Sequence, residues 1–380
     1  MTSEKDRPSK VASIDQHVKA RVIELGRSLE ARAAIYLDTK FWIILQRASA
    51  GGRSSPQESE LLRILRASVA SGHLFCPASE SVFLELLKQS DPSSRLDTAR
   101  LIDELSLGVT LLSGRARLAT EVAHFFHGLT SGSAALHPLR HLVWSKLSYV
   151  LGFLHPETPA LDSDTMLSVQ KEVFDYIWTI PLPTVVEKIG NVPDSESLNL
   201  QGIAATLNDG NRRHAGGIRS FEQAKKDELH GAADLCAEIA ADVISDMAAQ
   251  QDFAPSMRGS APLQQLRMMC SNAVFHALRS KPETRLQLPS AYVEAMLHAA
   301  VRWDKTRSIS GNDIYDFNHA SAALGYCNAF FTERPLRALI ESKHIALSTQ
   351  YPCRSISDVS EAVEYVAVHL ESRGLGRRTP

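Results

Sequence analysis

The chain has 380 residues, of which 44% are hydrophobic and 22% are charged, with 41 Lys and Arg against 43 Asp and Glu. These proportions exclude disordered, collagen-like and disulfide-scaffold classes, and the length allows about two or three domains. The formal net charge of −2 argues against a strongly basic nucleic-acid-binding domain. A local basic patch is still compatible with it.

Cysteine usage and hydropathy indicate the compartment. The five cysteines are an odd number, widely scattered and without a CxxC pair, which argues for a reducing compartment and against a structural zinc site. The charged first ten residues lack the apolar region of a secretory signal, and no stretch approaches the ~20 apolar residues that span a bilayer. We therefore expect a soluble, cytoplasmic protein with no membrane partner.

Short apolar runs alternate with amphipathic segments in the first third of the chain. The predicted strands are 33–37, 73–77 and 109–112. The predicted helices are 40–48, 56–70, 79–89, 94–107 and 115–127. Short strands that alternate with helices indicate a parallel sheet covered on both faces.

The pattern changes twice along the chain. Residues 128–309 contain helical patterns and almost no strand candidates, with 232–247 as a clear amphipathic helix. After residue 310 the alternation returns, with predicted strands at 329–332 and 345–348 and predicted helices at 313–326, 334–342 and 357–371. The sequence therefore predicts one α/β domain, 15–127 with 310–380, interrupted by an all-α insertion, 128–309.

Acidic residues stand where the predicted strands end or the following helices begin. Asp38 follows the first strand, Glu85 lies on the helix after the second, and Glu333 follows strand 329–332. Asp313 and Asp316 share one face of a helix because they are three residues apart. Parallel sheets place ligand sites outside the carboxyl ends of their strands, so these acids are expected to converge there. Such oxygen-rich sites hold Mg²⁺ or Mn²⁺, which serve phosphoryl transfer.

Each acid also has a structural explanation. Asp38 could cap the helix that follows it, and Asp313 and Asp316 could interact with a helix dipole. Glu85 alone is typical of a solvated helix face. Taken singly, each structural role is favoured, and only the pattern points to a metal site.

Three segments resemble the PIN-domain nucleases: IYLDTKFWIIL (35–45), LFCPASESVFLELL (74–87) and NDIYDFNHASAALGYCNAFFTE (312–333). In that family a strand ends in Asp followed by Thr or Ser, which is similar to Asp38 and Thr39. A second strand leads through a Ser to a Glu on the next helix, which matches Ser79 and Glu85, with Glu80 as a weaker competitor.

The third segment resembles the most specific family motif. Asp316 opens a helix of small residues, and the strand after it is followed by Thr332 and Glu333. Asp313 occupies the extra acidic position seen in many members. The resemblance covers at most residues 1–127 and 310–380, and the helical insertion resembles no family.

The resemblance implies a PIN-like three-layer sandwich and a metal-dependent ribonuclease with a water nucleophile. Some members of the family are toxins or defence nucleases. On this interpretation Asp38, Glu85 and Asp316 hold the catalytic Mg²⁺ or Mn²⁺, and Asp313 and Glu333 act as supporting or second-metal ligands. The supporting positions are Thr39, Ser79 and Thr332.

Basic residues near the acids could contact RNA, or single-stranded DNA. Lys and Arg supply the sequence-independent part of nucleic-acid affinity. Trp303 could stack on a base, although a buried Trp is the commoner outcome. The predicted phosphate contacts are Arg302, Lys305, Arg307, Arg115 and Arg117.

Other interpretations are open at this point. Lys40 stands where the family usually has Asn, and Glu333 where Asp is more frequent, which favours an inactive PIN-like scaffold that binds RNA or protein. The insertion could instead mediate assembly with a protein partner or a second copy of the chain. His319, three residues after Asp316, could touch the site or serve packing alone.

Overall fold

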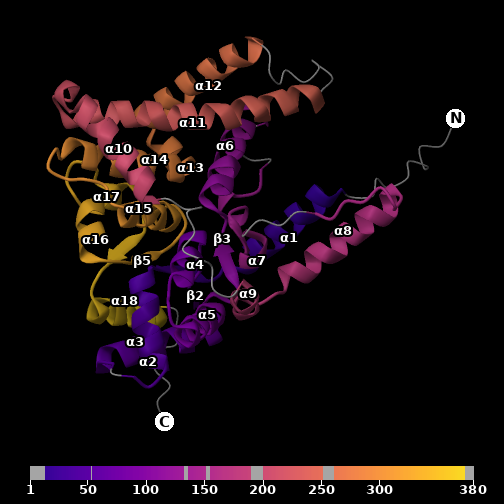
Figure 1. The fold of residues 1–380 in the computed structure, drawn as a ribbon, viewed down its shortest axis with the longest axis vertical. Helices are drawn as coiled ribbons and strands as arrows, with labels where there is room; N and C mark the ends of the chain where they lie inside the picture. Colours follow the sequence, from indigo (N-terminus) through magenta and orange to yellow (C-terminus); the bar gives the residue numbers. More distant parts are fainter. Residues whose placement is uncertain are drawn as a thin grey trace.

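The computed structural model describes residues 13–52, 54–131, 136–150, 155–189, 200–250 and 261–372. The chain is a mixed α/β protein in which helices predominate (Figure 1). The strands are β1 (Ala33–Leu37), β2 (Leu74–Phe75), β3 (Val109–Leu111), β4 (Trp144–Lys146), β5 (Ala329–Phe331) and β6 (Arg354–Ile356).

The helices fall into three groups along the chain. The first is α1 (Ile14–Ser28), α2 (Thr39–Ser49), α3 (Pro56–Ala70), α4 (Glu80–Leu87), α5 (Pro92–Ser106) and α6 (Gly114–Ser131). The second is α7 (Leu147–Val150), α8 (Ser163–Trp178), α9 (Leu182–Ile189), α10 (Leu200–His214), α11 (Phe221–Gln250), α12 (Ala261–Ser280), α13 (Pro282–Gln287) and α14 (Pro289–Trp303). The last is α15 (Gly311–Leu324), α16 (Arg334–Ile340), α17 (Leu347–Gln350) and α18 (Val359–Ser372).

The main sheet is parallel and has the order β2-β1-β5-β6. Every residue of β1 is buried, as expected for a central strand with both faces covered. An isolated bridge between Ala78 and Thr110 connects the end of β2 to β3, and β3 pairs with β4 in the antiparallel sense. The expected parallel sheet is therefore present.

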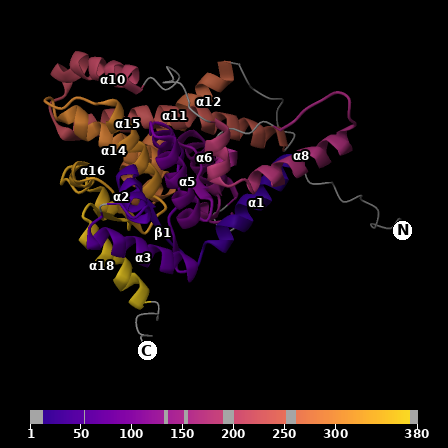
Figure 2. The same ribbon diagram turned by 60° about the horizontal axis from the view of Figure 1, so that its bottom comes forward.

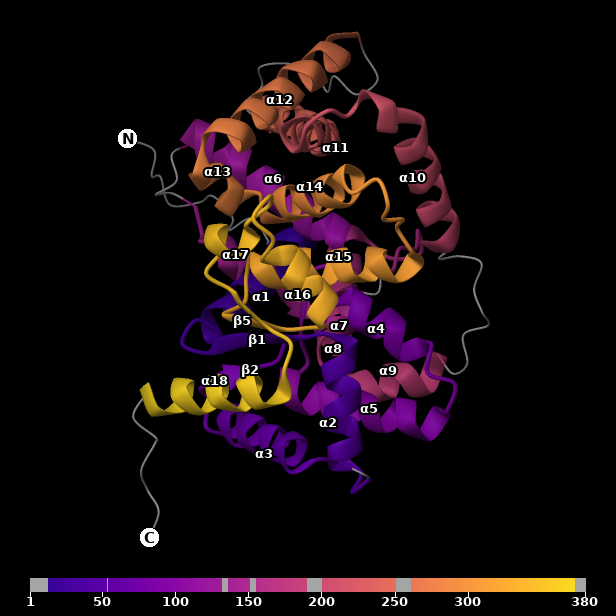
Figure 3. The ribbon, with the colours of Figure 1, turned by 90° about the vertical axis from the view of Figure 1, so that its left-hand side faces the viewer.

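Helices cover the sheet from both sides. In Figure 3, α3 and α18 lie below strands β1, β2 and β5, and α14 and α15 lie above them. The long helix α11 packs on α14, α6 and α12 and forms a further layer (Figure 1). Helices α1 and α8 run side by side at the edge of the molecule (Figure 2), around a small second core of Val22, Phe174 and Trp178.

Two expected elements differ from the structure. The expected strand at 345–348 is wrong: Ile345 and Leu347 are buried, but they lie in a turn and in α17. An apolar run this short cannot be assigned to strand or helix by its pattern alone. The sheet instead continues with β6, whose sequence, Arg-Ser-Ile, lacks the apolar run that predicts a strand; Arg354 is exposed. The 128–309 segment is not all helical, since it contains β4.

A buried polar network joins α6 to α14 and α15. Arg117 and Glu121 lie one turn apart on α6 and are 2% and 0% exposed. The Arg117 guanidinium donates to the Ser290 and Ser321 hydroxyls at 2.8 and 2.9 Å, and the Glu121 carboxylate accepts from the Ser290 and Tyr326 hydroxyls at 2.6 and 2.5 Å. Arg117, predicted as a phosphate contact, is thus engaged in a structural network. The network also makes α14 part of the central core.

Membrane-spanning segments are missing from the described helices, none of which is long and apolar enough to cross a bilayer.

The Arg117 network predicts a large stability effect. Burial raises the pKa of Glu121 to about 7, and the nearby Arg117 charge opposes this shift. Arg117→Met should lower the free energy of unfolding by about 3–5 kcal/mol because it leaves a buried carboxylate uncompensated. Adding Glu121→Gln should restore part of the loss in urea denaturation. A loss no larger than that of the exposed variant Arg100→Met would contradict the role of the network.

Candidate functional site

The ends of β1 and β5 lie side by side and carry two of the predicted acids. The backbone N–H of Asp38 donates to the carbonyl of Phe331 at 3.0 Å, which joins the last residues of both strands. Asp38 then begins α2, and Glu333 precedes α16. Helices α4 and α15 bring Glu85 and Asp316 from two other parts of the chain.

Asp38 is a buried N-cap. Its carboxylate accepts from the backbone N–H of Phe41 at 3.2 Å, and the side chain is 4% exposed. Burial raises the pKa of Asp38 to about 6, against the lowering effects of His319 and Thr332. The cap explains its place in the sequence but does not explain the burial of a charge, which is costly unless it is compensated.

Glu85 is held through one of its two oxygens. Its Oε2 receives the Thr39 hydroxyl at 2.5 Å and lies 2.7 Å from Nε2 of His319. Burial acts to raise the pKa of Glu85, but His319 and Thr39 hold it below its ordinary value. In the described part of the chain no hydrogen bond reaches Oε1. Glu85 therefore stays ionised with one oxygen available.

A chain of buried hydrogen bonds fixes His319 in turn. The Tyr36 hydroxyl lies 2.7 Å from Nδ1 of His319 and 2.6 Å from the Ser79 hydroxyl. Nε2–H of His319 donates to Glu85, and in the other two hydrogen bonds either partner can donate, so every member of the chain is satisfied. We refer to these four residues as the Tyr36–His319 chain. It fixes the carboxylate of Glu85 relative to the sheet.

Asp316 is the least compensated acid. Its carboxylate makes no hydrogen bond or ion pair with any residue that the structure describes. Burial, together with the charges of Asp38, Asp313 and Glu333, raises the pKa of Asp316 to about 7, against the lowering effect of His319. His319 thus contacts Glu85 directly and lowers the pKa values of Asp38 and Asp316 through its charge.

The remaining two acids have other surroundings. Asp313 forms a capping box with Ser310 and an ion pair with Arg307 at 2.8 Å. Although burial acts in the opposite direction, Ser310 and Arg307 hold the pKa of Asp313 below its ordinary value. Glu333 is exposed and its side chain caps no helix. Asp313 is therefore engaged in local structure, whereas Glu333 is free to face a ligand at the edge of the sheet.

The side-chain chemistry of these acids suits a divalent cation, but their spacing in this structure does not. Carboxylate oxygens are the ligands that Mg²⁺ and Mn²⁺ prefer, and the pKa values of Asp38 and Asp316 are raised mainly by burial and further by neighbouring carboxylates. Within the described residues, however, no three His, Cys, Asp or Glu side chains stand close enough to form a metal-binding group. Asp38, Glu85 and Asp316 would have to draw together around an ion.

The basic residues predicted to contact phosphates do not form one group in the structure. Arg302 is engaged by Glu228 at 2.7 Å and Arg307 by Asp313, so both have structural ion pairs. Lys305 and Arg115 are exposed. Arg115 lines a cavity of about 250 Å³ together with Glu80 and with Ser79 of the Tyr36–His319 chain. Lys305 lines a different cavity.

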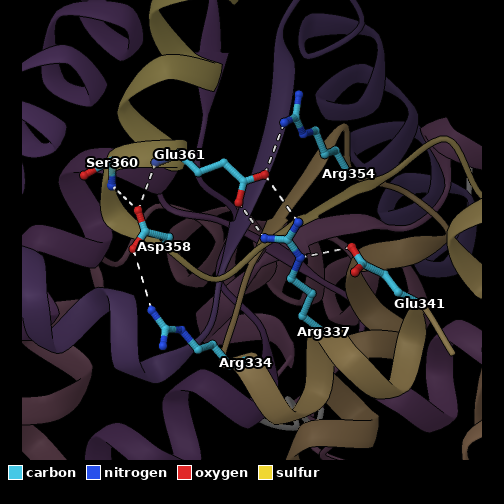
Figure 4. A network of polar contacts seen from close by, with 7 residues as sticks. All are labelled: Arg334, Arg337, Glu341, Arg354, Asp358, Ser360 and Glu361. Atoms are coloured by element: carbon cyan, nitrogen blue, oxygen red, sulfur yellow. Dashed lines mark hydrogen bonds and ion pairs between the residues drawn. The ribbon is translucent and has the colours of Figure 1, made fainter.

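A basic group near Glu333 was not anticipated from the sequence. Arg334, Arg337 and Arg354 come together around Asp358 and Glu361 in the network of Figure 4. Arg334 is 79% exposed, and its distance of 4.0 Å from Asp358 is long for an ion pair, so most of its charge faces solvent. The sequence signal for this basic group was the position of Arg334 directly after Glu333, at the end of β5.

Comparison with family models, with curated proteins and with solved structures gives no match for this chain.

The Tyr36–His319 chain predicts a stability loss when its centre is removed. Tyr36→Phe leaves Nδ1 of His319 buried without its partner and removes one of the two hydrogen bonds of the Ser79 hydroxyl, which should cost about 1–3 kcal/mol of unfolding free energy. Urea denaturation measures the change. Tyr176→Phe is the matched control, since this side chain is 65% exposed. Equal effects of the two variants would contradict the buried chain.

The raised pKa of Asp316 predicts a pH-dependent gain in stability. The charged form is disfavoured in the folded protein, so the penalty is absent below about pH 4, grows as the pH rises, and is complete above about pH 7. Without added metal, Asp316→Asn should therefore stabilise the protein by about 1–3 kcal/mol at pH 8, a value reduced by partial solvent access. At pH 4 the effect should vanish.

Melting temperatures at both pH values, with EDTA present, measure this effect. Asp97→Asn is the matched control, because Asp97 is an exposed acid on α5. A gain for Asp316→Asn that is larger at low pH would contradict the charge repulsion.

Proposed function

We propose that the protein is a metal-dependent ribonuclease with a PIN-like fold. The observation that carries the proposal is that Asp38, Glu85 and Asp316, from three separate segments of the chain, all interact with His319: Glu85 by direct contact, Asp38 and Asp316 through the effect of His319 on their pKa values. The parallel sheet and the position of the acids near its carboxyl edge support the same fold and site.

The roles follow from the surroundings of each acid. Asp38 and Asp316 carry the uncompensated negative charge that attracts a cation, and Glu85 offers one oriented oxygen. Glu333 is the nearest additional carboxylate at the edge of the sheet, whereas Asp313 contributes through its charge. A Mg²⁺ or Mn²⁺ ion bound by these residues would supply a nucleophilic water and stabilise charge on the phosphate.

The surface chemistry supports RNA as the substrate class. Arg334 and Lys305 present charge to solvent on either side of α16 and would contact phosphates. All five cysteines are buried and none forms a disulfide, which supports a reducing compartment such as the cytoplasm. The helical segment of α8 to α14 offers a surface for a protein partner or a second copy.

The second candidate function is a PIN-like scaffold without catalytic activity. The observation that favours it is the wide spacing of the acids among the described residues, where no metal-binding group is formed. A scaffold would bind RNA or protein but would show no affinity for Mn²⁺. Calorimetric titration with Mn²⁺ separates the two candidates.

An RNA cleavage assay tests the first candidate. Wild-type protein should cut RNA with Mn²⁺ or Mg²⁺ and should be inactive in EDTA, with single-stranded DNA as a parallel substrate. Asp38→Asn should lower the rate by about 10²–10⁴-fold, because it removes charge from the site. Its fold should persist, because Asn also serves as an N-cap.

Asp97→Asn is the control variant and should retain full activity. Cleavage that survives Asp38→Asn would place the reaction elsewhere. Failure of both cleavage and Mn²⁺ binding would support the scaffold.

A further inference from the structure

A cavity of about 880 Å³ lies apart from the acids, where three helices meet. It is bordered by the start of α11, the end of α14, and the end of α16 with the turn after it. Aromatic rings and cations share its wall: Phe221, Trp303 and His344 with Arg219 and Lys305. We propose that this cavity binds a nucleotide unit of single-stranded RNA, which rests on and extends the proposed ribonuclease function.

The aromatic side chains provide a surface for a base. The rings of Phe221 and His344 pack together with centroids 5.3 Å apart. Trp303 lines the same cavity and is only partly buried, whereas Trp42, Trp144 and Trp178 are in the core. Nucleic-acid bases stack on such rings without regard to sequence, each stack contributing about 1–3 kcal/mol.

The charges around the cavity favour a phosphate. Arg219 and Lys305 are exposed and make no ion pair with any residue in the described part of the chain. The one carboxylate in the wall, Asp304, accepts the N–H and the hydroxyl of Thr306 at 3.1 and 2.7 Å. These bonds lower the pKa of Asp304 and engage one of its oxygens in the turn. The cavity therefore has an excess of positive charge beside its rings.

The fold connects this cavity to the acidic edge of the sheet. Helix α16 begins after Glu333 and ends near Leu339, which lines the cavity, so the two sites are about 10 Å apart along the helix. That distance corresponds to about three stacked nucleotides. Residues 304–310 also lead directly from the cavity into α15, which carries Asp316. A strand held at Trp303 would thus reach the acids within a few nucleotides.

Binding is measured independently of cleavage, in EDTA and with Asp38→Asn protein. Fluorescence anisotropy of a labelled uridine dodecamer gives the affinity at about 50 and about 200 mM salt. Lys305→Ala and Arg219→Ala should each weaken binding and reduce the slope against log salt by about one. Trp303→Ala should weaken binding by about 5–100-fold, whereas Trp303→Phe should retain most of the affinity.

Lys19→Ala is the matched control, since Lys19 is an exposed lysine on α1, on the other side of the molecule from α16 (Figure 2). Uridine monophosphate is the second probe. If it binds as tightly as the dodecamer, the cavity is a mononucleotide site and the strand proposal is overturned. Loss of affinity no greater than that of Lys19→Ala would also overturn it. Binding without cleavage by the wild type would instead count against the ribonuclease alone.

Discussion

The contact between His319 and Glu85 is the interaction on which the candidate site depends. The charges of Asp38 and Asp316 repel each other, and burial makes that repulsion stronger because little solvent screens it. His319 is 1% exposed and cannot move away, since its other nitrogen is held by the Tyr36 hydroxyl, which in turn bonds to Ser79. Glu85 is therefore kept ionised and oriented, whereas the charged forms of Asp38 and Asp316 are disfavoured in the folded protein.

The sheet and the outer helices cooperate to hold this arrangement. Asp316 and His319 are carried by α15, which is tied to α6 and α14 through the Arg117 and Ser321 contact. The helical layer therefore has a structural role in the α/β core, because its contacts determine the position of α15. Removing residues 128–309 as a block would expose the surfaces of α6 and α15 that α14 covers and would leave the Arg117 network without Ser290.

Local patterns predicted what is local and missed what depends on distant contacts. β1, Asp38 as the cap of α2, and the strand–Thr332–Glu333 junction follow from apolar runs and neighbouring polar residues. The role of His319 depends on contacts with residues 234 and 283 positions away, which no local pattern encodes. The buried contacts of Arg117 were missed for the same reason, since its serine partners come from α14 and α15. The choice of Glu85 over Glu80 rests on helix geometry and on Thr39.

The electrostatics of the acids couple ligand binding to stability. Asp38 and Asp316 have pKa values of about 6 and about 7, so each exchanges its proton close to neutral pH. A cation that binds them must displace those protons, and its apparent affinity therefore rises with pH until both are ionised. A ligand that binds only the folded state also stabilises it in proportion to the logarithm of its concentration. The burial and repulsion that disfavour the charged forms of Asp38 and Asp316 thus also favour a positive charge beside them.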